Sequence, residues 1–250
     1  MNKLFYINDL EKYCELYLNN NLRINFCWKY RFEKEGENKI KILAKQLLND
    51  MNCIFNGCQY LNSLDLSNFN TSNVEDMRGI VQSCYSLTSI NLSNCFNTRN
   101  VKYMNFMFNG CRSLTSLNLS NFNTNNVEDM KGMFQLCDSL ISLDLSNFNT
   151  INVKDMSYMF NKCYSLISLN LSNFNTSSVK NMKCMFDQCH SLSSLNLSNL
   201  KINNTQDLQD VLINLNEYCN ITLNFIENNN QSILENVESF LEKLKNFIKK

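Results

Sequence analysis

Six cysteines recur at nearly constant intervals, and they are the residues of this chain with the clearest capacity for chemistry. Thiols can form disulfides, bind zinc or act as nucleophiles. The alternative is a structural role, in which each thiol is a small buried side chain. The six are Cys58, Cys84, Cys111, Cys137, Cys163 and Cys189, separated by 26, 27, 26, 26 and 26 residues.

The sequence favours the structural role. Cys53/Cys58 and Cys184/Cys189 form C-x4-C pairs, but the chain's single histidine, His190, is the only imidazole that could join them, so we expect no metal site. Stacked cysteines would lie about 5 Å apart, a distance that permits disulfides. The first residues contain no apolar secretory segment, however, and we therefore predict reduced thiols.

Catalytic motifs are lacking as well. Cys189 and His190 are adjacent, so their side chains should point apart rather than form a nucleophile and base. The sequence contains no G-x-S-x-G motif and no glycine-rich phosphate loop. We expect neither enzymatic activity nor a cofactor.

The cysteines belong to a longer repeat, seen from Met130 to Thr150 as MKGMFQLCDSLISLDLSNFNT. The single spacing of 27 arises where LSNFNT becomes LSNCFNT, with one residue inserted beside Cys95. A period in this range predicts a solenoid, because one such unit cannot bury its own apolar face and must stack on its neighbours.

Each repeat has a strand side and a helix side. Leu114, Leu117 and Leu119 follow L-x-x-L-x-L, the spacing of the strand in leucine-rich repeats. Asn152 and Asp155 resemble a helix N-cap and its acidic first turn. The stripe that follows indicates a helix or a tight succession of helical turns. It consists of Val153, Met156, Met159, Phe160 and Cys163.

The predicted fold class is thus α/β: a leucine-rich-repeat solenoid with parallel strands on one side, short helices on the other, and α/β caps at both ends. We assign residues 1–50 to an N-terminal cap, 51–200 to the solenoid and 201–250 to a C-terminal cap. The N-terminal cap should contain helices over 8–19 and 38–49 and a strand over 22–32. The C-terminal cap should contain a degenerate helix over 206–217, a strand over 221–226 and an amphipathic helix over 233–248.

The string MFNGCRSLTSLNLSNFNTNNVEDM, from Met107 to Met130, resembles the repeat of BspA-like leucine-rich-repeat surface proteins, in the variant first grouped with mycoplasma lipoproteins. The resemblance covers about residues 51–200. It implies a leucine-rich-repeat solenoid and, for many members, adhesion to host or matrix proteins or contact between microbial cells.

Variable exposed positions identify the candidate binding residues. The strand side should present a nearly uniform lattice of serine, asparagine and aspartate, either as a solvated face or as a platform for a repetitive ligand such as a glycan. Aromatic and charged side chains vary instead at the position after each core cysteine, and such residues are typical of protein recognition. The predicted partner-binding residues are Tyr85, Arg112, Asp138, Tyr164 and His190.

Charge and hydropathy limit the partners and the location. The formal net charge is zero, so we expect no nucleic-acid partner. No apolar run is long enough to span a bilayer, although the basic end of the last helix, KLKNFIKK, could contact an anionic membrane. We expect a cytoplasmic protein or one exposed at the cell surface without a recognisable signal. Its function should be to bind a protein partner of unknown identity; the alternative is a structural or self-associating scaffold.

Overall fold

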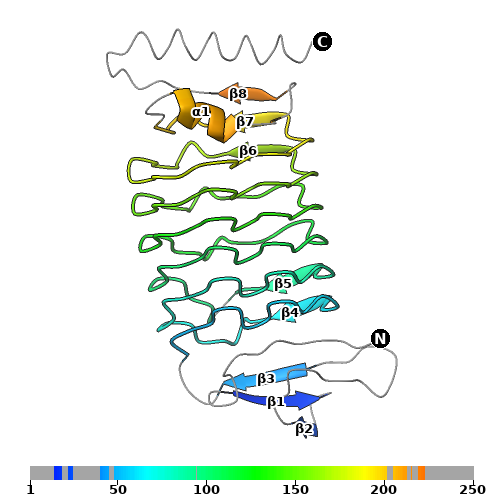
Figure 1. Ribbon diagram of the computed structural model, residues 1–250. Coiled ribbons are helices and arrows are strands. Elements are labelled where there is room, and N and C mark those ends of the chain that lie inside the picture. Colours follow the sequence, from blue (N-terminus) through cyan, green and yellow to red (C-terminus); the bar gives the residue numbers. More distant parts are fainter. Residues whose placement is uncertain are drawn as a thin grey trace.

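The computed structural model describes residues 14–18, 22–24, 40–44, 48–93, 95–201, 205–212, 215 and 219–222. Within this part of the chain, short strands lie across a tall stack of looped repeats, with one helix near the last repeat (Figure 1). The strands are β1 (Cys14–Leu18), β2 (Leu22–Ile24), β3 (Ile40–Ala44), β4 (Ser63–Asp65), β5 (Ser89–Asn91), β6 (Ser168–Asn170), β7 (Ser194–Asn196) and β8 (Asn220–Thr222), and the helix is α1 (Thr205–Leu212).

The segment before the repeats forms an antiparallel sheet with the order β2-β1-β3. The helices predicted over 8–19 and 38–49 are therefore wrong where β1 and β3 lie, because these residues pair across strands, Leu16 with both Ile24 and Ile42. The strand predicted over 22–32 is confirmed at β2, and its remainder lies outside the described residues.

Parallel strands from successive repeats pair in register on one side of the stack. β4 pairs with β5, and β6, β7 and β8 form a second sheet in that order. Partners such as Leu169 and Leu195 are 26 residues apart, which is the period of the sequence. The strands predicted from L-x-x-L-x-L are thus confirmed in the outer repeats. The equivalent residues 116–118 and 142–144 of the two central repeats are not strands.

Asparagine side chains supply hydrogen bonds between repeats at the corners that follow the strand positions. The Asn147 side chain donates to the backbone oxygens of Leu119 (3.0 Å) and Phe122 (2.8 Å) in the preceding repeat. Buried Thr150 both donates to the carbonyl of Asn175 (3.0 Å) and accepts from its N–H (2.8 Å). The amide and hydroxyl groups at the corners therefore satisfy backbone groups that would otherwise be buried without partners.

The side predicted to be helical is built from turns instead. From residue 48 to 201 the described chain contains no helix. Alternate N–H groups donate to the next repeat, as Phe134 does to Met159 (2.9 Å), while those between them close turns, as Gln135 does to Gly132 (3.1 Å). Two residues per repeat have positive φ, including Tyr158 (59°) and Lys162 (62°), which a continuous helix does not permit. The short helices of our predicted fold class are thus wrong.

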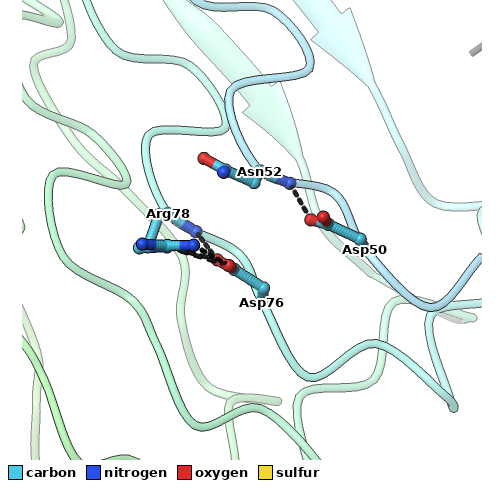
Figure 2. Close-up of polar contacts among 4 residues, drawn as sticks. All are labelled: Asp50, Asn52, Asp76 and Arg78. Atoms are coloured by element: carbon cyan, nitrogen blue, oxygen red, sulfur yellow. Dashed lines mark hydrogen bonds and ion pairs between the residues drawn. The ribbon is translucent and has the colours of Figure 1, made fainter. Parts of the chain in front are cut away.

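The acids expected in a first helical turn close Asx turns. Figure 2 shows Asp50 accepting the N–H of Asn52 (2.7 Å) and Asp76 accepting the N–H of Arg78 (3.0 Å). The same positions pair between repeats through parallel bridges, beginning with Asp50 and Asp76. These carboxylates close Asx turns and cap no helix. Asp155, predicted in a first helical turn, likewise accepts the N–H of Ser157 (2.8 Å), which corrects that assignment.

The interior is filled by columns of identical side chains. Phe134 stacks between Phe108 and Phe160, with ring centroids 5.7 and 5.6 Å away, and all three are fully buried. The core thiols are buried beside this column. Cys137 donates its S–H to the carbonyl of Phe108 (3.2 Å), and Cys163 donates to that of Phe134 (3.1 Å). Each cysteine thus serves both as an apolar filler and as a weak donor to the preceding repeat.

The predicted burial of the core cysteines is confirmed, and among the described cysteines none is disulfide-bonded. Burial raises the pKa of the Cys111, Cys137 and Cys163 thiols above its ordinary value. These thiols are therefore protonated and poorly nucleophilic at neutral pH.

We expect alkylating reagent to modify exposed Cys95 quickly in the native protein and to modify Cys111, Cys137 and Cys163 only after unfolding. Mass spectrometry of native and denatured samples measures this difference, with Cys95 as the internal control. Rapid native labelling of the three core cysteines, or a ladder of disulfides in protein taken from its own cells, would contradict the assignment.

The last repeat is followed by α1 and β8. Val211 and Leu212 are buried, and the Cys184 N–H donates to the carbonyl of Asp210 in α1 (2.7 Å). The helix predicted over 206–217 and the strand predicted over 221–226 are confirmed in their described parts. The amphipathic helix predicted over 233–248 lies outside the described residues.

Candidate functional site

The residue after each core cysteine occupies the same place in every repeat. Backbone bonds connect these places: the Ser165 N–H donates to the carbonyl of Asp138 (3.2 Å), and the Ser191 N–H donates to that of Tyr164 (3.2 Å). Residues far apart in sequence therefore become neighbours along the stack. The six residues at this place are Gln59 and the five predicted to bind a partner, which we call the variable column: Tyr85, Arg112, Asp138, Tyr164 and His190.

The first three members of the variable column contact one another. The Arg112 guanidinium lies over the ring of exposed Tyr85, 5.0 Å from its centroid. Arg112 Nε is 3.7 Å from Asp138 Oδ2, close enough for an ion pair but not for a hydrogen bond. Arg112 thus joins an aromatic ring on one side to a carboxylate on the other, and its side chain keeps half of its surface exposed.

Asp138 lies deeper than its neighbours in the column. Its Oδ1 is buried and has no hydrogen-bond partner among the described residues. Burial raises the pKa of this carboxyl, and the positive charges of Arg112 and Lys162 oppose that effect. A partly desolvated acid with unused acceptor capacity favours a partner that brings a donor or a positive charge.

The last two members form a second aromatic pair. The rings of Tyr164 and His190 are stacked, with centroids 5.6 Å apart and an interplanar angle of 13°. His190 is exposed and Tyr164 is half-buried. The structure thus brings all five predicted residues onto one edge, in two contacting groups.

Two exposed residues that follow members of the variable column were not predicted. Ile141 and Ile167 are 47% and 50% exposed, three residues after Asp138 and Tyr164. Comparing the repeats position by position would have found them, because every other repeat carries a polar residue there.

A second set of variable positions follows the first methionine of each repeat, and its first member, Arg78, makes local contacts. Arg78 forms an ion pair with Asp76 (Figure 2). Its guanidinium lies over the ring of Tyr103, 5.6 Å from the centroid. Nearby, Lys102 pairs with Glu75 and Lys154 with Glu128. The remaining positions of the set are Asn105, Lys131, Ser157 and Lys183.

The described residues contain no cluster of three or more histidine, cysteine or acidic side chains that could hold a metal ion. Cys189 donates its S–H to the carbonyl of Phe160 (3.0 Å), and burial raises the pKa of this thiol to about 12. Its thiolate is therefore not available to react beside His190 at neutral pH. The edge presents aromatic rings, a guanidinium and a carboxylate.

The fold and the edge define the class of protein: a repeat protein with parallel strands, whose variable side chains are aligned by its period. The sequence matches the family described as "Mycoplasma protein of unknown function, DUF285" three times, over residues 28–141, 110–225 and 138–250. The chain belongs to this family. No curated protein matches it.

In the part of the chain that the structure describes, no helix combines the length and the apolar character that crossing a bilayer requires. The basic C-terminal segment for which membrane contact was considered lies outside the described residues.

Proposed function

We propose that the chain is a non-catalytic interaction module, a leucine-rich-repeat-type solenoid of the BspA-like kind, which binds a protein partner through the variable column. The observation that carries this proposal is the alignment of five variable side chains on one edge, three of them aromatic rings and one an arginine. Tyrosine and arginine contribute a large share of the binding energy in protein interfaces.

The contacts within the column support a binding role. The rings of Tyr85 and Tyr164 are each held by a neighbour from the next repeat, Arg112 and His190, so less side-chain entropy is lost when a partner binds. The surrounding backbone is fixed by the inter-repeat bonds, and a rigid scaffold preserves the spacing of the column.

Replacing Tyr85, Arg112 and Tyr164 together with alanine should abolish capture of the partner while leaving the melting temperature nearly intact, because the three side chains lie outside the interior columns. Wild-type and variant proteins, immobilised at equal density and exposed to extracts and surface fractions of the source cells, are compared by quantitative mass spectrometry. Asn118→Ala/Asn170→Ala, on the strand-side lattice, is the matched control.

Capture that survives the triple change but fails in the lattice control would move the binding face to the strand side. If no protein is captured and the purified chain instead assembles as its concentration rises in sedimentation experiments, the scaffold function is correct and the binding proposal fails.

A further inference from the structure

In each repeat, the position three residues after the place of the variable column is exposed. Two neighbouring repeats carry isoleucine at this position, Ile141 and Ile167. Ile167 donates its N–H to the carbonyl of Ile141 (3.1 Å), so the two isoleucines are adjacent on the surface. Single exposed apolar residues are ordinary on protein surfaces, but these two are adjacent, and Ile167 is three residues after Tyr164. The corresponding residues of the other repeats are polar: Asn62, Thr88, Thr115 and Ser193.

Acidic groups flank the first of these isoleucines. Ile141 is three residues after Asp138 and three before Asp144, so an acid stands on each side of it in the chain. Asp144 is exposed, and its Oδ1 accepts the N–H of Ser146 (2.9 Å). This bond holds the pKa of Asp144 below its ordinary value, so the carboxylate is charged at neutral pH.

The cations near these acids, Arg112 and Lys162, act on Asp138. From each core cysteine to residue 70, 97, 123, 149, 175 or 201 of its repeat, the charged residues are Asp65, Arg112, Asp138, Asp144 and Lys201, three acids against two bases. Arg112 is engaged by Tyr85 and Asp138. Among the ion pairs of the described residues, none includes Asp144.

We propose that Ile141, Ile167 and Tyr164, flanked by Asp138 and Asp144, form the docking point for an extended protein segment in which lysines or arginines flank an aliphatic side chain. This inference rests on the proposed function and specifies the chemistry of the partner. The aliphatic side chain covers the isoleucines, and the flanking cations meet the two carboxylates. An anionic membrane is disfavoured, because the carboxylates repel acidic head groups.

The probe is the blocked peptide Lys-Thr-Thr-Ile-Thr-Thr-Lys, and its control has glutamate at both ends. Isoleucine methyl NMR of the full chain follows each site separately. We expect saturable shifts of the Ile141 and Ile167 methyl signals with the lysine peptide. Ile151, equally exposed (46%) but on a different corner, should not respond. Equal shifts with the glutamate peptide, equal shifts at Ile151, or no saturable shift would each overturn the proposal.

Matched variants separate charge from apolar contact. Asp144→Asn should weaken peptide binding about two- to fivefold, the range of an exposed ion pair, whereas Asp65→Asn, at the same repeat position beside Asn62, should not. Ile141→Ser/Ile167→Ser should weaken it about tenfold, and Ile151→Ser should have no effect. Equal losses in the control variants would overturn the proposal.

The proposed function and the proposed chemistry of the partner can be refuted independently. A partner that is captured through the variable column, while the peptide does not bind, refutes only the basic and aliphatic chemistry of the partner. Peptide binding at Ile141 and Ile167 without any captured protein refutes the proposed function and leaves only an adventitious affinity.

Discussion

Phe134→Ala should lower the free energy of unfolding by about 3–5 kcal/mol, the range measured for removing a buried phenylalanine ring. Phe134 is fully buried in the middle of the stack, and its ring lies within 5.7 Å of Phe108 and 5.6 Å of Phe160. The substitution leaves a cavity between two rings that the backbone ladder holds in place. The loss should therefore not be recovered by collapse of the neighbouring repeats.

Urea denaturation followed by circular dichroism measures this loss. Tyr103→Ala is the matched control, because Tyr103 is 40% exposed and contacts Arg78 only across a ring face, an interaction worth about 0.5–1 kcal/mol. Similar losses in the two variants would show that the phenylalanine column does not stabilise the stack.

Removing residues 201–250 should make the chain aggregate. β8 pairs with β7, and the buried side chains of Val211 and Leu212 lie in α1 beside the last repeat. Without them, the edge of β7 and the apolar interior of the last repeat face water, which favours edge-to-edge association. Light scattering and dye binding to exposed apolar surface detect this change.

Val211→Asp in the full chain is a second, smaller perturbation of the same contact. It places a charge in a fully buried position and should lower the melting temperature strongly without removing β8. A truncated chain that stays monomeric and melts as the full chain does would refute the capping role of α1 and β8.

The period predicted much of the stack, because the 26-residue spacing fixes which residues become neighbours once the repeats pair. The local structure of the side built from turns could not be predicted from the period. The stripe that ends at Cys163 fits a helix and a succession of turns equally well, since both place residues three apart on one face. Positive φ angles distinguish the two structures. A tyrosine such as Tyr158 or a lysine such as Lys162 does not reveal a positive φ in the sequence.

Glycine gave a partial signal. Gly79 and Gly132 have φ angles of 54° and 56° at the repeat position that Tyr158 occupies with 59°. A Cβ on Gly132 would come within 2.6 Å of the Phe106 ring, so this glycine is required for space as well as for conformation. Gly57 and Gly110 stand at the other position of positive φ, so four repeats carry a glycine within the stripe. Glycine argues against a helix interior, and weighing it would have favoured turns.

The candidate edge was predictable because its residues follow the most regular feature of the sequence. The contacts along this edge were not predictable, because whether Arg112 contacts Tyr85 and Asp138 depends on its side-chain conformation. Ile141 and Ile167 were missed because an isoleucine beside a buried leucine resembles another core residue in sequence. The structure shows that they are exposed, as the polar residues of the other repeats at this position indicate.

The most direct test of the account is site-specific photocrosslinking in the source cells. Benzoylphenylalanine is placed at Tyr85 or Tyr164 in the variable column, and at Ile151 on another corner as the control. The account predicts a covalent adduct with a second, different protein from positions 85 and 164 and none from position 151. Equal adducts from all three positions, or adducts only between copies of this chain, would contradict it.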